Sequence, residues 1–294
     1  MNQRTMNKRF TALTLALVSA LAVLGCSVDA TTRGSGPPAD AVQSLSLNPA
    51  AAAAVGPRAN SIALLSDGAG TTVAELSGSV ATPANIQGSA GTMADFLVFV
   101  ITDVDAYWSA VWEEAGIPEP QVNYAFPGTG ESVSTLCGYS DDLSAFYCPV
   151  DDQIVVSQSL AGRVWDGTLA ANQDGTKTHE TGDFSVAFVV AHEFAHSLQA
   201  ELGILRPDVL VYPTVRTELH ADCWAGVWAE SAEFNGILDQ GDIEEAAQTA
   251  LDVGDYAIDD PTHHGTPDQR SQAFLTGYDR GEAGGCDGYL LGEY

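Results

Sequence analysis

His192-Glu193-Phe194-Ala195-His196 is the most informative stretch of this 294-residue chain. It has the pattern His-Glu-x-x-His within a segment of helical character. Residues four apart project from the same face of a helix, about one 5.4 Å turn apart, so both imidazoles can bind one zinc ion. Glu193 lies one position off that face, where it can act as general base toward the water that the metal binds. The motif predicts a zinc hydrolase with one zinc ion as its cofactor.

The helix that carries the motif is predicted to run from Phe184 to Leu202, with Asp183 as its N-cap and Gly203 at its end. Apolar residues occupy almost every side of it, which is typical of a helix at the centre of a domain. Two histidines and a glutamate in such surroundings need polar partners or a metal. The motif is therefore expected in the interior of the domain.

A catalytic zinc needs a third protein ligand and an open position for water. The best source is Glu218-Leu219-His220-Ala221-Asp222, in a second helix predicted from Thr214 to Glu230. Glu218 and Asp222 are four residues apart and share one face, so Glu218 is predicted to complete a His-His-Glu site. Asp222 would accept the second ring N–H of one of the two motif histidines. His220 points away from that face and is interpreted as a half-buried histidine rather than a ligand.

The alternative to a metal site is a chance match, because His-Glu-x-x-His alone also occurs on unrelated helices. Only six histidines occur in this chain, and two of them have the required spacing. An acidic pair with the proper spacing follows on a separate helix. This combination favours zinc over chance.

His264 is a further candidate for the active site, in the sequence His263-His264-Gly265-Thr266. It could donate a hydrogen bond to the oxyanion that forms when a peptide carbonyl is attacked. A polar loop in which His264 is a turn residue or a surface cap is an equally good interpretation. A helix is predicted directly after it, with Thr266 as the cap and Gly277 at the end.

The cysteines indicate two disulfides in an exported protein. Besides Cys26 there are four, and an even number in an exported chain favours disulfides over free thiols. Cys137 and Cys148 are close in sequence across a predicted turn, which pairs them. Cys223 and Cys286 then pair by elimination. A cysteine zinc site is a weaker alternative, because no C-x-x-C spacing occurs.

Residues 1–25 are predicted to be a secretory signal, with three basic residues followed by the apolar run Phe10 to Leu24. That run is shorter than the roughly 20 residues of a membrane span. It ends in Val23-Leu24-Gly25-Cys26, which resembles a bacterial lipobox and predicts lipidation of Cys26. An uncleaved anchor or an ordinary signal peptide is the alternative. The expected location is the cell envelope, outside the cytoplasmic membrane or in the outer membrane or periplasm, with a lipid anchor to the membrane.

The rest of the chain divides into a tether and a single domain. Residues 26–88 are rich in Ala, Pro, Gly and Ser and are predicted to be a flexible, poorly structured tether. Residues 89–294 are long enough for one globular core. The formal net charge is −28. Such a charge repels phosphate backbones, so nucleic acid is excluded as a partner.

The fold class predicted for residues 89–294 is α+β, dominated by helices and with a small sheet. A first helix is expected from Thr92 to Ala115 and a third from Asp242 to Val253. Strand character is found in Gln121 to Phe126 and in Gln153 to Ser157. The second of these strands precedes the motif helix and is expected to pair with an extended substrate.

Several blocks between about residues 92 and 286 resemble the bacterial neutral zinc metallopeptidase family, in the family's order. No single block is specific, but their combination is. The matching blocks are Cys137-Gly138, Phe146-Tyr147-Cys148-Pro149, Gln153-Ile154-Val155-Val156, Ala191-His192-Glu193-Phe194-Ala195-His196, Leu198-Gln199, Glu218 to Ala229, Gly241-Asp242-Ile243-Glu244-Glu245-Ala246, His264-Gly265-Thr266, Gln269-Arg270 and Gly277-Tyr278.

The resemblance implies a zincin-like domain and a zinc-dependent peptidase that hydrolyses a peptide or protein substrate. It also implies an active-site role for His264 and supports the two disulfides. The chain departs from the family where Ala195 replaces a usual Gly, where Ser197 replaces a frequent His, and where His220 replaces a residue that is more often Gln. A lipobox also stands where relatives more often have a membrane anchor. The alternative functions are a non-catalytic binding or scaffold lipoprotein and a zinc amidase acting on cell-wall peptides.

Overall fold

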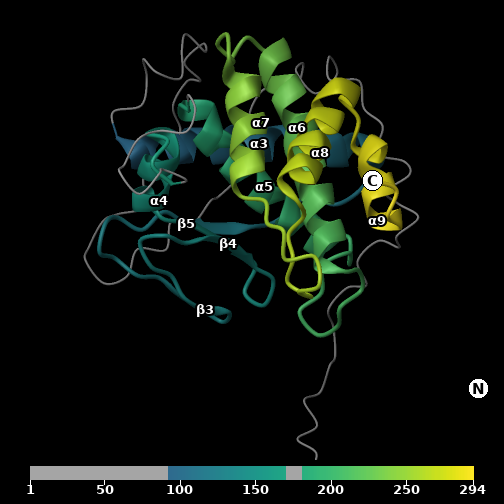
Figure 1. The fold of residues 1–294 in the computed structure, drawn as a ribbon, viewed down its shortest axis with the longest axis horizontal. Helices are drawn as coiled ribbons and strands as arrows, with labels where there is room; N and C mark the ends of the chain where they lie inside the picture. Colours follow the sequence, from purple (N-terminus) through teal and green to yellow (C-terminus); the bar gives the residue numbers. More distant parts are fainter. Residues whose placement is uncertain (1–91, 170–180) are drawn as a thin grey trace, which may run out of the picture. The chain divides into compact units, whose positions relative to one another are not determined.

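The computed structural model describes residues 92–169 and 181–294, and Figure 1 shows their arrangement. The predicted signal segment 1–25, the lipidation site Cys26 and the tether 26–88 lie outside the described residues. Among the helices that are described, none combines the length and the hydropathy that crossing a bilayer would need. The described part is an α+β fold in which helices dominate and the sheet is small and mixed, as predicted.

A three-stranded sheet of order β1-β5-β4 forms one part of the fold. The central strand β5 (Gln153–Val156) pairs in parallel with β1 (Asn123–Ala125) and antiparallel with β4 (Ala145–Cys148). Both sides of β5 are therefore occupied, and all four of its residues are buried. The prediction that this strand pairs with substrate is wrong, because a central strand has no free backbone edge. The edge toward the functional site belongs to β4, which the sequence analysis did not identify.

A small hairpin lies beside this sheet. It consists of β2 (Ser134–Thr135) and β3 (Gly138–Tyr139), which pair antiparallel. Cys137 at its turn forms a disulfide with Cys148 at the end of β4, which ties the hairpin to the sheet. This pairing confirms the prediction.

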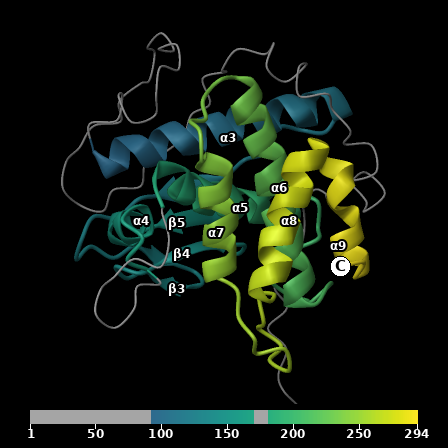
Figure 2. The ribbon, with the colours of Figure 1, turned by 45° about the horizontal axis from the view of Figure 1, so that its top comes forward.

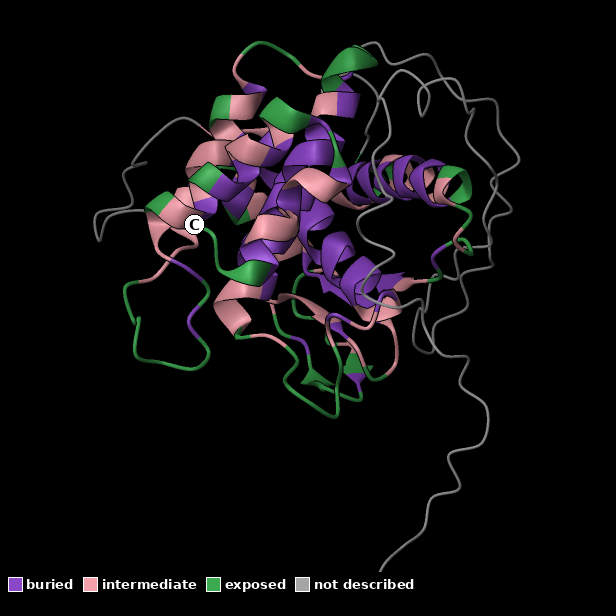
Figure 3. Cartoon of the chain, turned by 90° about the vertical axis from the view of Figure 1, so that its right-hand side faces the viewer, coloured by how far each residue is buried: buried purple, intermediate pink, exposed green. Residues whose placement is uncertain are grey.

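The helices form the larger part of the fold, and α5 lies at its centre. α5 contacts α3, α4, α6 and α7 and also the strands β4 and β5. Figure 2 shows α3 lying across one side while α6, α7 and α8 lie on another, and Figure 3 shows that the buried residues concentrate where these helices meet. The helices are α3 (Met93–Ala115), α4 (Gln158–Trp165), α5 (Asp183–Glu201), α6 (Thr214–Phe234), α7 (Asp242–Asp252), α8 (Pro267–Arg280), the 3₁₀ helix η2 (Ala283–Cys286) and α9 (Asp287–Leu291).

One helix start differs from the prediction by one residue. The N-cap of α5 is Gly182, and the carboxylate of Asp183 accepts a hydrogen bond from the N–H of Phe184 within the first turn. By contrast, α7 begins at Asp242 as predicted, and the carboxylate of this residue accepts a hydrogen bond from the N–H of Asp239 at 2.7 Å. Both acidic residues lie in the first turn of a helix, where they interact favourably with the helix dipole.

Gly277 does not end α8, which continues to Arg280 and is closed by Gly281 in the left-handed conformation. Gly277 lies inside the helix because α6 passes directly over it. A Cβ at Gly277 would be 1.8 Å from the carbonyl oxygen of Cys223, and one at Gly226 would be 2.0 Å from that of Phe274. The two glycines therefore allow the backbones of α6 and α8 to approach closely, which brings the start of α8 beside the acidic face of α6.

The second predicted disulfide is also present, between Cys223 of α6 and Cys286 of η2. It links helix α6 to a segment that follows α8. The loop closed by this bond contains the segments that form α7 and α8. The cross-link therefore reduces the conformational freedom of these segments in the unfolded chain.

Candidate metal centre

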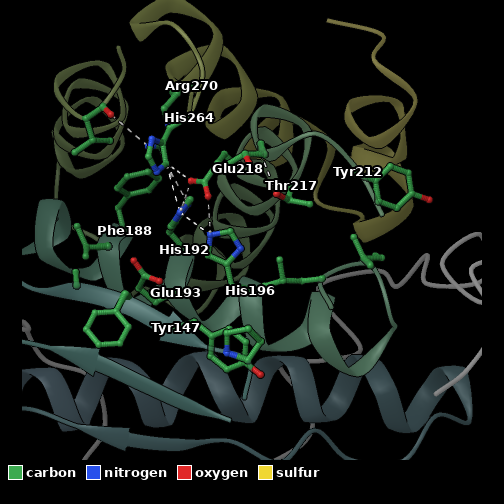
Figure 4. A pocket seen from close by; sticks show the side chains of 18 of the residues that line it. Tyr147, Phe188, His192, Glu193, His196, Tyr212, Thr217, Glu218, His264 and Arg270 are labelled. Carbon is green, nitrogen blue, oxygen red and sulfur yellow. Dashed lines mark hydrogen bonds and ion pairs between the residues drawn. The ribbon is translucent and has the colours of Figure 1, made fainter. Parts of the chain in front are cut away.

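The side chains of two neighbouring helices converge at the centre of the fold (Figure 4). His192 and His196 lie one turn apart on α5, and their ring centroids are 4.7 Å apart. Glu218 reaches them from α6, which packs against α5. All three are at most 9 % exposed. Together they form a group whose ligand atoms lie close enough to hold one metal ion.

The distances within this group fit a tetrahedral cation site. The Nε2 atoms of the two histidines are 3.2 Å apart. Nε2 of His192 is 3.3 Å from Oε2 of Glu218, and Nε2 of His196 is 3.4 Å from its Oε1. Zinc bonds to nitrogen and oxygen are about 2.0–2.1 Å, so neighbouring ligand atoms of a tetrahedral site lie about 3.3–3.4 Å apart. The three observed separations, two of which end on different oxygens of the Glu218 carboxylate, are therefore of the size found between neighbouring ligands of one zinc ion.

The orientation of His192 is set by Asp222, also on α6. Nδ1 of His192 lies 2.8 Å from Oδ1 of Asp222. Arg270 of α8 donates two hydrogen bonds to the same carboxylate, from Nε to Oδ2 and from NH2 to Oδ1, each of 2.8 Å. Although burial opposes ionisation, the Arg270 guanidinium lowers the pKa of Asp222 below its ordinary value. An ionised Asp222 can only accept, so Nδ1 of His192 carries the proton and Nε2 presents a lone pair.

The orientation of His196 is set by Gln199, one turn further along α5. Nδ1 of His196 lies 2.9 Å from Oε1 of Gln199. The amide nitrogen of Gln199 donates to the carbonyl oxygen of Thr217 at 2.8 Å and faces Nδ1 of His220 at 3.1 Å. Because that carbonyl can only accept, the amide orientation is fixed and Oε1 must accept from His196. Nε2 of His196 therefore also presents a lone pair.

Acceptor atoms of three residues thus face one another in a buried space. A single proton can bond two of these atoms, whereas a cation can bond one from each residue. Burial lowers the pKa of His192, but Asp222 outweighs burial and raises it to about 10, so the metal-free centre holds a proton. Burial would raise the pKa of Glu218, yet the two histidines hold it well below its ordinary value. A divalent cation would displace the proton and satisfy all three ligands, which is the chemistry of a zinc site.

Glu193 lies beside the ligands and lines the same cleft. Its side chain is pointed into the cleft next to His192 (Figure 4). The residue is 8 % exposed, and burial raises the pKa of its carboxyl group. A raised pKa makes the ionised carboxylate a stronger base, as a proton acceptor in catalysis requires.

The structure places His264 in the loop between α7 and α8, on the wall of the cleft. Its backbone N–H donates to Oδ2 of Asp255 at 3.0 Å, and its side chain is 51 % exposed. His263 is instead buried, with Nδ1 2.5 Å from Oδ1 of Asp255. The position of His264 on the cleft wall is compatible with a role in the active site, and that role stays a prediction.

His220 differs from the sequence-based interpretation, because it is fully buried rather than half-buried. It lies outside the ligand group and contacts the amide of Gln199, so it supports His196 through one intermediate residue. Burial lowers the pKa of His220 to about 3, which keeps its ring neutral.

Sequence reasoning missed the supporting roles of Gln199 and Arg270. The signal for Gln199 was present, since it is a polar residue one turn after His196 in an otherwise apolar helix. Arg270 had no comparable local signal, because its partner Asp222 is 48 positions earlier in the chain. Only the packing of α8 on α6 brings these two residues together.

Replacing Gln199 with Met is expected to weaken zinc binding by about 10–100-fold, the usual effect of removing a residue that orients a ligand. The ring of His196 would lose its hydrogen-bond acceptor while the ligand itself remains. Competition with a zinc-binding dye measures the change, and Gln272→Met on the exposed side of α8 is the matched control. Equal zinc affinity in the two variants would show that Gln199 does not orient the ligand.

A buried His-His-Glu centre in a helix-dominated α+β domain is the arrangement of a metallopeptidase-type zinc protein. The sequence profile of a family described as "Putative neutral zinc metallopeptidase" matches residues 60–289. The chain belongs to this family.

Similar proteins occur in distant bacteria. Uncharacterized protein YpfJ of Escherichia coli K12 is 30% identical over 216 residues, which are 66% of this chain and 70% of the relative. Uncharacterized protein Mb2605 of Mycobacterium bovis is 33% identical over 209 residues, which are 63% of this chain and 66% of the relative. No solved structure gives a significant match.

Proposed function

We propose that this protein is an exported zinc-dependent peptidase. The observation that supports this most strongly is the convergence of three lone pairs, from His192, His196 and Glu218, beside the carboxylate of Glu193. These three side chains would hold the zinc ion, and a catalytic zinc with three protein ligands also binds a water molecule. Membership of a family described as zinc metallopeptidases supports the same function.

Each residue of the centre has a defined task in this proposal. When bound, a zinc ion supplies an electrophile and lowers the pKa of a water ligand toward about 7. Glu193 accepts a proton from the attacking water and passes it to the leaving amine. His264 donates a hydrogen bond to the carbonyl oxygen as negative charge develops on it. Asp222 and Gln199 hold the two imidazoles in the tautomer that ligation needs.

The substrate is proposed to bind along β4 in an extended conformation. Ala145, Phe146 and Tyr147 of this strand line the cleft. Within the described sheet β4 pairs only with β5, so its other backbone edge is available to a peptide. Addition of a peptide strand to a sheet edge provides affinity through main-chain hydrogen bonds.

Export and lipid anchoring through Cys26 belong to the proposal on sequence grounds, from the signal segment and the lipobox. The two disulfides support an oxidising compartment, because disulfides are rare in the reducing cytoplasm.

The test is a comparison of zinc-loaded protein on casein, on synthetic peptides and on peptidoglycan. We expect casein and peptides to be cleaved, cleavage to stop when 1,10-phenanthroline removes the metal, and activity to return with added zinc. Cleavage of peptidoglycan alone would show that the protein is a cell-wall amidase rather than a peptidase. A zinc-loaded protein that cleaves none of the three would instead be a binding protein.

A further inference from the structure

The cleft around the metal centre has a volume of about 600 Å³ and extends beyond the ligands in two directions. Figure 4 shows Phe188 on one side of the two histidines and Tyr212 on the other, with Tyr147 of β4 between and below them. The cleft can therefore receive substrate side chains on both sides of the reacting bond.

The first of these regions lies toward the N-terminal half of α5, where α4 packs against it. We call it the α4 pocket. Phe188 and Val189 precede His192 by one turn, so this pocket opens directly beside the metal ligands. All its lining side chains are apolar, and they are Leu160, Val164, Leu169, Phe188 and Val189.

The second region lies toward the C-terminal end of α5, along the connection to α6. We call it the loop pocket. Three of its apolar side chains are strongly exposed, with 49 % for Val209, 72 % for Leu210 and 44 % for Val211. Apolar side chains grouped on one short loop at the rim of a cleft indicate a surface that another molecule covers. The apolar lining side chains of the loop pocket are Ile204, Leu205, Val209, Leu210, Val211 and Tyr212.

The charges in the cleft disfavour an acidic substrate. Among the described residues that line it, both guanidinium groups already have carboxylate partners, since Arg206 pairs with Asp208 and Arg270 pairs with Asp222. Arg270 is buried in its ion pair, whereas Arg206 is half exposed at the rim, where water screens its charge. An acidic side chain that entered the α4 pocket would lose its water without gaining a partner. One that approached the loop pocket would meet a protein whose formal net charge is −28.

From these pockets and the open edge of β4 we infer the substrate class. The protein cleaves extended peptide segments at bonds with a large apolar residue on both sides, one side chain entering the α4 pocket and the other the loop pocket. This inference rests on the proposed peptidase function. It adds a preference for apolar residues on both sides of the cleaved bond, which neither the metal ligands nor the family membership implies.

The experiment uses internally quenched peptides of one length and one flanking sequence, which differ only in the two residues at the cleavage site. Zinc-loaded full-length protein is expected to cleave a Leu-Leu peptide with the highest kcat/KM. Replacing either Leu with Glu is expected to lower kcat/KM by about 100-fold, because the apolar contacts would be lost and neither pocket offers a buried cationic partner. Mass spectrometry of the products establishes which bond is cut.

Variants assign the two pockets. Leu210→Asp in the loop pocket is expected to reduce cleavage of the Leu-Leu peptide. The same variant should improve cleavage of a peptide that carries Lys at one position of the cleavage site, and should not improve cleavage of a peptide that carries Lys at the other position. Leu169→Asp in the α4 pocket should produce the same exchange at the opposite position. Phe234→Asp is the control and should behave as wild type, because Phe234 is an exposed apolar residue at the end of α6 that does not line the cleft.

Two results would overturn the inference and leave the peptidase function intact. The first is equal cleavage of the Leu-Leu and Glu-Glu peptides, and the second is sensitivity to only one of the two positions. If casein and every peptide remain intact while zinc is bound, the proposed peptidase function fails, and the substrate inference fails with it.

Discussion

Glu193→Gln is expected to lower kcat/KM for peptide cleavage by about 10²–10⁴-fold, the range that a positioned general base contributes. The amide keeps the size of the side chain but cannot accept a proton. The residue is almost fully buried beside His192 and is not a member of the ligand group, so the fold and the zinc content should be unchanged. Steady-state kinetics with parallel metal analysis by mass spectrometry measures both quantities.

The control for this experiment is Glu244→Gln, on the exposed side of α7, which should retain full activity. Retained activity in Glu193→Gln would remove Glu193 as the base. Loss of zinc together with activity would also contradict the account, because it would place Glu193 among the ligands rather than beside them.

Glu218→Ala is expected to have the second large effect, a loss of zinc affinity of more than about 100-fold. This exceeds the effect of removing an orienting residue, because a coordinating atom itself is lost. Arg270 keeps its two hydrogen bonds to Asp222 in this variant, so its charge is not left unpaired. The apo-protein should therefore still fold, and the defect should be confined to the metal.

Thermal unfolding provides the measurement for Glu218→Ala. A ligand that binds only the folded state stabilises it by about 4 kcal/mol when its concentration is about 1,000 times its Kd. Added zinc should therefore raise the Tm of wild-type protein and of Glu244→Ala, and should leave the Tm of Glu218→Ala nearly unchanged. An equal rise in all three proteins would show that zinc stabilises the fold from another place.

The parts of the centre that depend on local spacing could be predicted from sequence. His192 and His196 share a face because they are four residues apart in a helix, and the same holds for Glu218 and Asp222. Which histidine Asp222 contacts could not be derived in this way. The answer, His192, depends on how α6 lies against α5, which is a property of tertiary packing.

The misinterpreted elements share one cause, which is that their partners are distant in sequence. A glycine often follows the last residue of a helix, so the sequence suggests that α8 stops at Gly277. The structure instead requires a glycine at this position because the backbone of Cys223 in α6 lies against it. The strand predicted from Gln153 to Ser157 is expected from the sequence to bind substrate, although its nearly continuous apolar run is typical of a central strand. β4 has a short and weakly patterned sequence, and its pairing with β5 defines it as a strand.

The central claim is that one cation is bound by two side chains of α5 and one of α6. Anomalous diffraction from a zinc-loaded crystal, recorded at the zinc absorption edge, tests it most directly. The account predicts one peak in the described domain, about 2.0–2.1 Å from Nε2 of His192, Nε2 of His196 and a carboxylate oxygen of Glu218. A fully loaded protein whose peak lies elsewhere, or whose ion contacts fewer than these three side chains, would contradict it.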